Sequence, residues 1–220
     1  MTSRSMRHWN GNVCVSIDIN TTGSDQSIHE IVQISAIPLT SSFDNHPDYL
    51  PFQMFLRPNS FEHANEDSTP ITIETKRKIM MYGVSHDQGY DMFCNWIEKL
   101  KIPASRRGGK YCGIIPLGYR YEEIAGSWLR NWMTIGAYNT FFSDRSFDPC
   151  IVAQHMNNMA EFNIEQVPYS KLNIKWLAKQ HAIDSELYKG DMRDAQARAV
   201  LAAKIYKAQC QDIAYLGWNR

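Results

Sequence analysis

The sequence predicts an α/β domain in which helices flank a mixed β-sheet. Three apolar runs rich in β-branched residues follow one another near the N-terminus, at residues 12–19, 28–39 and 49–58. Amphipathic segments come next, and one further apolar run, residues 111–118, interrupts them. A group of strands followed by helices and another strand is typical of a mixed sheet covered by helices.

The first three runs are expected to form an antiparallel meander, because consecutive strands usually pair. Their β-branched residues favour buried strands. We expect the fourth run to form a central strand of the same sheet.

The other segments carry helical signals. Asp148 followed by Pro149 predicts an N-cap and first helical position, and Ala-rich residues 190–210 give the clearest helix. The expected helices span residues 71–83, 87–102, 122–133, 146–162, 170–183 and 190–210.

Composition limits the class of protein. The 220 residues contain 23 basic and 23 acidic side chains, so the net charge is zero and a strongly cationic nucleic-acid binder is not indicated. The five cysteines form no C-x-x-C pair, which argues against a zinc site and fits a reducing cytoplasm. We expect a flexible arm over residues 1–12, a single domain over residues 13–220, and neither a secretory signal nor a membrane span.

Residues 16–23 read SIDINTTG, and Asp18 lies at the end of the first apolar run. Asn20 shares a face of the strand with it, because side chains two residues apart point the same way. Such an aspartate either closes an Asx turn or holds a metal. The amide at position 20 needs an explanation if the site holds a metal.

Three segments in order resemble motifs of the DEDD 3′–5′ exonucleases, the DnaQ-like branch of the ribonuclease-H-like fold. Residues 16–23 are similar to the D-x-E-T-x-G motif, residues 114–133 to the G-H-N-x-x-F-D segment, and residues 187–206 to the final H-x4-D. The resemblance covers about residues 13–209. It implies a ribonuclease-H-like fold and a compact form like stand-alone phage and bacterial exonucleases.

The resemblance carries over residue by residue, and several positions depart from it. Asp18 and Asp194 match the first and last acidic residues and would be the remaining metal ligands. Asn20 stands where the family has Glu, Ile124 where it has Asp, and Lys189 where it has the catalytic His.

These departures predict a degenerate catalytic site. In the family, carboxylates hold two divalent cations and the His acts as general base. Here Asp18 and Asp194 give −2 and Lys189 returns +1, too little negative charge for two such ions. A lysine ammonium beside both aspartates could occupy part of the metal's volume, and a further carboxylate would then be uncompensated. We therefore expect no cofactor and lean towards no enzymatic activity.

Two alternatives stay open. Glu122, Glu123 or Asp148 could replace the missing second-motif carboxylate, which would leave an active Mg²⁺- or Mn²⁺-dependent exonuclease on single-stranded DNA or RNA. The chain could also be an assembly protein that uses the fold as a scaffold.

The expected partner of a degenerate protein is a nucleic-acid 3′ end or another protein. Tyr119 and Arg120 stand where the family's second motif has His and Asn, and with Lys189 they could contact bases or phosphates. The neutral net charge slightly favours a protein partner.

Overall fold

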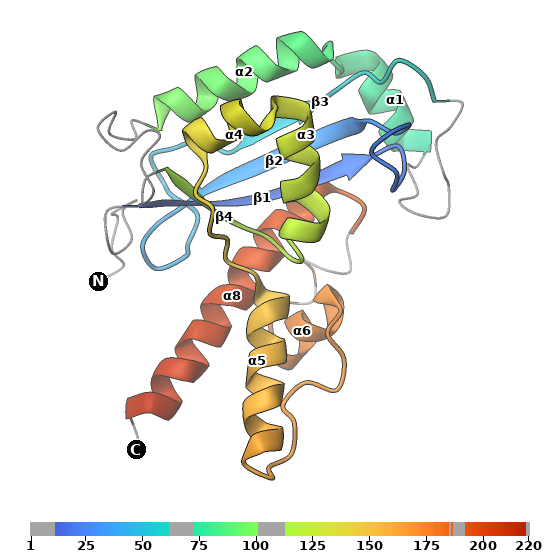
Figure 1. Cartoon of the computed structure of the whole chain (residues 1–220). Helices are drawn as coiled ribbons and strands as arrows, with labels where there is room; N and C mark the ends of the chain where they lie inside the picture. Colours follow the sequence, from blue (N-terminus) through green and yellow to red (C-terminus); the bar gives the residue numbers. More distant parts are fainter. Residues whose placement is uncertain (1–11, 62–72, 101–112, 185, 187–191, 219–220) are drawn as a thin grey trace.

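The computed structural model describes residues 12–61, 73–100, 113–184, 186 and 192–218, with the side chains of residues 73 and 216–218 left out. Nearly all of the arm predicted over residues 1–12 lies outside this part, and so does Lys189. Helices cover both faces of a four-stranded sheet whose strand order is β3-β2-β1-β4 (Figure 1).

The first three strands form the predicted antiparallel meander. They are β1 (Val13–Thr21), β2 (Ile31–Leu39) and β3 (Phe52–Phe55), and β2 pairs with both neighbours in antiparallel register. β4 (Ile114–Leu117) then pairs with β1 in parallel. The mixed sheet is therefore confirmed.

The expectation that the fourth strand is central is wrong. β4 pairs with β1 alone among the described strands, and β1 and β2 are the interior strands. Pro116 lies within β4 and has no N–H to donate, which suits an edge position. On its outer side β4 makes isolated bridges to Phe142 and Phe147, so an extended segment covers that edge.

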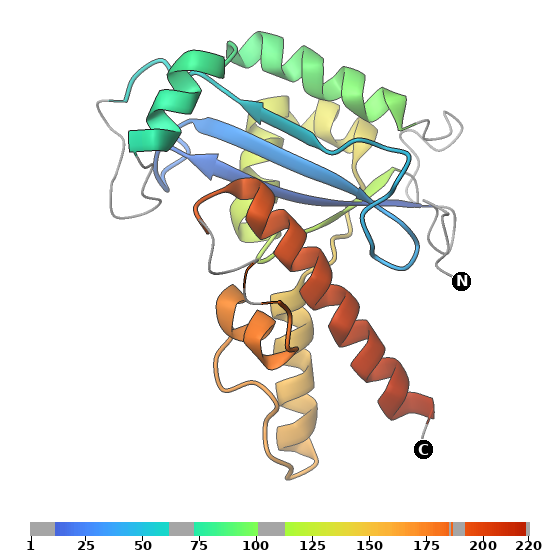
Figure 2. The same ribbon diagram turned by 180° about the vertical axis from the view of Figure 1, so that it is seen from behind.

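Two helical layers bury β1 completely. Its odd-numbered residues, such as Ile17, pack in one cluster with Phe93 of α2 (His86–Lys99) and Trp128 of α3 (Ser127–Met133). Its even-numbered residues face α8 (Ala195–Trp218), which crosses the other face of the sheet (Figure 2). Because side chains alternate along a strand, the even-numbered Asp18 and Asn20 lie on the α8 side.

Small residues let α8 approach the sheet closely. Ser16 of β1 donates from its hydroxyl to the Ala199 carbonyl oxygen at 2.7 Å. The buried alanines of the helix are Ala195, Ala199, Ala202 and Ala203. The same contact brings the first turn of α8 to the end of β1.

The remaining helices match the predicted segments with shifted boundaries. Asp148 caps α5 and Pro149 opens it, as predicted, whereas α8 begins five residues later than expected and ends eight residues later. α4 was not predicted, and Thr134 caps it with a side chain that accepts from the Ala137 N–H. The other elements are α1 (Ile73–Tyr82), the π-helical turn η3 (Glu122–Gly126), α4 (Ile135–Phe141), α5 (Pro149–Phe162) and α6 (Ile174–Gln180). None of the described helices is long and apolar enough to cross a membrane.

Candidate functional site

A guanidinium holds the Asp18 carboxylate near the end of β1. Arg198 Nε donates to Asp18 Oδ2 at 3.1 Å and Nη2 donates to Oδ1 at 2.7 Å. The two side chains are 8% and 17% exposed, Asp18 the lower. A bidentate arginine–carboxylate pair has fixed geometry and is stronger than a single hydrogen bond. A cation that the chain itself carries thus engages both oxygens of Asp18.

Arg198 also joins the strand to the segment that precedes α8. Its Nη2 lies 2.7 Å from the Ile19 carbonyl oxygen and 2.9 Å from Asn20 Oδ1, and its Nη1 donates to the Met192 carbonyl oxygen at 3.0 Å. The guanidinium is therefore fixed by acceptors on two sides, as a bound cation would be.

The geometry accounts for the amide at position 20. Asn20 Nδ2 donates to Gln33 Oε1 at 2.6 Å and to the Arg193 carbonyl oxygen at 2.5 Å, while its Oδ1 faces Arg198. A glutamate carboxylate has no N–H to donate, so both acceptors would lose the hydrogen bond that Asn20 supplies. Asn20 is a donor and an acceptor at once, and this network uses both.

Asp194 belongs to the same network and precedes the first residue of α8. Gln33 Nε2 donates to Asp194 Oδ1 at 2.6 Å, and the Gln196 N–H donates to the same oxygen at 3.3 Å. Gln33 Oε1 accepts from the Ala195 N–H at 3.3 Å. Asp194 therefore caps the helix and orients Gln33. Gln33 is not among the site residues that the sequence predicts.

These donors do not fit a pair of divalent cations. Asp18 and Asp194 supply −2 and Arg198 returns +1, a net −1. Mg²⁺ and Mn²⁺ require several anionic or carbonyl oxygens, and the Asp18 oxygens are already hydrogen-bonded to Arg198. Within the described ranges, no three His, Cys, Asp or Glu side chains form a group that could hold a metal.

Arg198 is the residue that the sequence prediction missed. The prediction placed a cation beside Asp18 and Asp194 but assigned it to Lys189, which lies outside the described residues. Arg198 follows Asp194 by four positions, a spacing that puts the two on one face of a helix. This four-residue spacing could have indicated that Arg198 lies near Asp194. It does not show that this face of the helix packs against β1.

Residues 114–133, which resemble the second motif, form β4 and a tight connection into η3 and α3. At Gly118 an added Cβ would lie 2.8 Å from the Ile17 carbonyl oxygen, so a larger residue would crowd β1. Ile124 is 39% exposed and offers no oxygen ligand. Glu122 forms an ion pair with Arg130 at 2.7 Å, and Glu123 pairs with Arg120.

The Asp148 carboxylate accepts hydrogen bonds from backbone N–H groups. Its Oδ1 accepts from the Cys150 N–H at 2.8 Å, and its Oδ2 accepts from the Tyr121 N–H at 3.1 Å. Burial raises the pKa of this carboxyl, although the backbone amides oppose the rise. The N-cap interpretation of Asp148 is confirmed, and both of its oxygens have protein partners.

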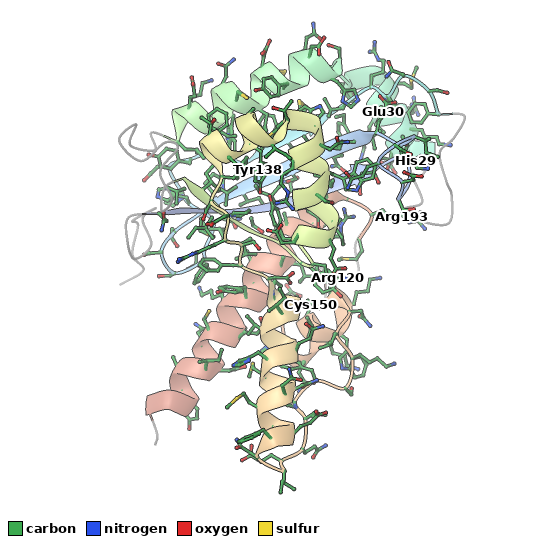
Figure 3. All side chains as sticks on the ribbon, in the orientation of Figure 1. His29, Glu30, Arg120, Tyr138, Cys150 and Arg193 are labelled. Carbon is green, nitrogen blue, oxygen red and sulfur yellow. The ribbon has the colours of Figure 1, made fainter. Side chains whose placement is uncertain are left out.

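A cleft of about 400 Å³ lies beside the Asp18–Arg198 pair. Tyr119 lines it, donates from its hydroxyl to the Leu172 carbonyl oxygen at 2.8 Å, and has its pKa raised by burial to about 12. Figure 3 shows Arg120 close to Cys150, where the sheet meets α5. The other lining residues are Ile19, Thr21, Gly23, Ser24, Glu123, Ile124, Trp128 and Ile174.

Several solved structures similar to this chain are exonucleases. E. coli Exonuclease I in complex with a dA13 oligonucleotide matches at 14% identity with a TM-score of 0.63, over 92% of this chain and 42% of that one. The nuclease domain of 3′hExo, a DEDDh family member bound to rAMP, matches at 15% identity and 0.60, over 90% and 92%. Exonuclease I from Methylocaldum szegediense matches at 13% identity and 0.59, over 90% and 40%.

The chain has the ribonuclease-H-like fold of the DnaQ-like exonucleases. It spans 40–43% of the length of the Exonuclease I chains that it matches, and about nine tenths of the 3′hExo nuclease domain. No protein-family model and no curated protein sequence matches it. TM-scores of 0.59 to 0.63 at identities of 13–15% show the fold alone, because one fold can carry many functions.

Proposed function

We propose that this chain is a catalytically degenerate 3′–5′ exonuclease-fold protein that binds the ends of single-stranded nucleic acid and does not hydrolyse them. The observation that carries the proposal is the bidentate pair between Asp18 and Arg198. Asp18 corresponds to the first acidic residue of the family's motifs. In the folded chain its charge is neutralised by a guanidinium in place of a metal.

The cleft supports a binding role. Its volume of about 400 Å³ falls within the range of roughly 300–1,000 Å³ found for ligand pockets. Tyr119 lines it with half-buried aromatic surface suited to stacking on bases, and Arg120 lies in the turn that follows Tyr119. Exonuclease I has been crystallised with single-stranded oligonucleotides, which makes this ligand the first to test.

A nuclease assay separates the binding protein from the enzyme. Wild type and Asp18→Ala are incubated with Mn²⁺ and labelled single-stranded DNA or RNA. We expect no hydrolysis by wild type above the level of Asp18→Ala. Hydrolysis that Asp18→Ala abolishes would contradict the proposal and favour an active exonuclease in which Glu123, which shares the cleft with Asp18, supplies a further carboxylate.

Filter binding at low salt tests the ligand. Arg120→Ala and Lys189→Ala should each weaken binding of a single-stranded oligonucleotide several-fold, because each removes a cation. Lys99→Ala, at the exposed end of α2, is the matched control and should bind like wild type. Equal binding by all the variants would contradict the nucleic-acid proposal and point to a protein partner instead.

A further inference from the structure

Two exposed apolar surfaces of opposite charge lie at opposite ends of the molecule, and we propose that they bind each other between copies of this chain. The first is the α5 knob, formed by Glu161, Phe162, Ile164 and Glu165. Phe162 is 85% exposed and Ile164 is 96% exposed, and both glutamates are exposed. The knob therefore presents two large apolar side chains between two negative charges.

The backbone of the knob favours a contact role for Ile164. This residue follows the end of α5 with φ at 60°, and the Glu165 N–H donates back to the Ala160 carbonyl oxygen at 2.8 Å. Glycine is the usual residue at such a position. A β-branched side chain there is strained by about 1–3 kcal/mol. The knob thus keeps an exposed isoleucine where glycine would be less strained.

The second surface is the α1 patch, formed by Arg77, Lys78, Met80, Met81 and Tyr82. Its two methionines and its tyrosine are 57–65% exposed, and its two basic residues are exposed as well. Across α1, three basic residues stand against the single acidic Glu74, a net charge of +2. Methionine side chains adapt to the shape of a partner, so the patch can receive a bulky apolar group.

The negative charge of the α5 knob indicates which kind of surface can bind it. The knob carries −2, and the carboxyl end of α5 adds partial negative charge. A phosphate backbone or an anionic membrane would be repelled, whereas a basic apolar surface such as the α1 patch is complementary. The chain has zero net charge, so two copies do not repel each other at long range.

The positions of the two surfaces set the geometry of assembly. Figures 1 and 2 place α1 beside the sheet and the end of α5 at the far tip of the molecule. The knob of one copy and the patch of the next would therefore meet head to tail, which generates an open chain or a ring. Because few side chains are involved, we expect weak association, visible at about 100 μM and lost near 1 μM.

Sedimentation velocity over this concentration range tests the proposal. Wild type should show concentration-dependent species larger than the monomer, and high salt should weaken them. Phe162→Ser/Ile164→Gly should remain monomeric, as should Arg77→Glu/Met81→Ser. Leu50→Ser removes another exposed apolar side chain, 83% exposed and outside both surfaces, and should associate like wild type.

A mixture of the two deficient variants gives the decisive result. Each keeps one intact surface, so the mixture should form a one-to-one dimer and nothing larger. Wild type that stays monomeric at every concentration would overturn the proposal. So would self-association of either deficient variant alone, or loss of association in Leu50→Ser, since these outcomes indicate a different interface or non-specific aggregation.

Discussion

At position 198 an arginine provides the positive charge beside the Asp18 carboxylate. Its guanidinium contacts Asp18, the Ile19 carbonyl oxygen and Asn20, all within 3.1 Å. A buried carboxylate is costly unless a positive group or hydrogen-bond donors compensate its charge. Arg198 belongs to α8, so the cation that pairs with Asp18 comes from the chain itself.

The Asp18–Arg198 pair should show strong coupling in stability measurements. Arg198→Met leaves Asp18 without its cation, and we expect a loss of about 3–5 kcal/mol in the free energy of unfolding. Adding Asp18→Leu should restore much of this loss, because no buried charge then stays unpaired. Urea denaturation of both single variants and the double variant measures the coupling. Additive losses would show that the two side chains do not act as a pair.

Two substitutions should create a metal site. Asn20→Glu together with Arg198→Ala changes the local charge from −1 to −3 and frees the Asp18 oxygens. We expect this double variant to bind Mn²⁺ in calorimetry and wild type to show no binding. Asn20→Glu alone, which retains Arg198, is the control and should bind at least tenfold more weakly than the double variant. Equal Mn²⁺ binding by wild type would refute this account.

At the level of elements, α8 links the site to the rest of the fold. Arg198 lies in its first turn. Asp212, nearer the C-terminal end of α8, contacts His181, the C-cap residue of α6. His181 Nδ1 lies 3.1 Å from an Asp212 oxygen, and its Nε2 lies 2.9 Å from the Tyr169 hydroxyl. Burial of the imidazole lowers the pKa of His181, against the attraction of Asp212.

The lowered pKa of His181 predicts a loss of folding stability in mild acid. Unfolded histidine titrates near pH 6.5. Because the folded pKa of His181 is lower, the unfolded state takes up its proton first as the pH falls. The contribution of His181 is therefore complete above about pH 6.5 and is lost as the pH falls through the folded pKa. His181→Gln should reduce the difference in unfolding free energy between pH 7 and pH 5. An unchanged difference would assign it to another group, such as His86, whose pKa burial also lowers.

For the whole molecule, a built-in cation predicts that folding does not depend on divalent metal. A ligand at a hundred times its Kd stabilises a protein by about 2.7 kcal/mol, which would shift Tm by several degrees. We expect Mn²⁺ or EDTA to change the Tm of wild type by less than about 1 °C. A clear rise with Mn²⁺ that Asp18→Ala removes would show that a metal binds at Asp18.

The pattern of residues predicted much of this molecule. The β-branched runs predicted the meander, and Asp148–Pro149 predicted the start of α5. The ordered motifs predicted the exonuclease fold. These signals are local, or they depend only on order along the chain, so they can be read without knowing which surfaces meet. The roles of Tyr119, Arg120 and Lys189 in nucleic-acid binding remain predictions.

Tertiary structure decided which side chains meet. Arg198 lies 180 residues after Asp18, and only the close approach of alanine-lined α8 to the even-numbered face of β1 brings the two together. The same approach explains Asn20, because its amide needs acceptors from Gln33 and Arg193 that are distant in sequence. The chain alone therefore determined the fold. Packing of α8 against β1 determined which side chain neutralises Asp18.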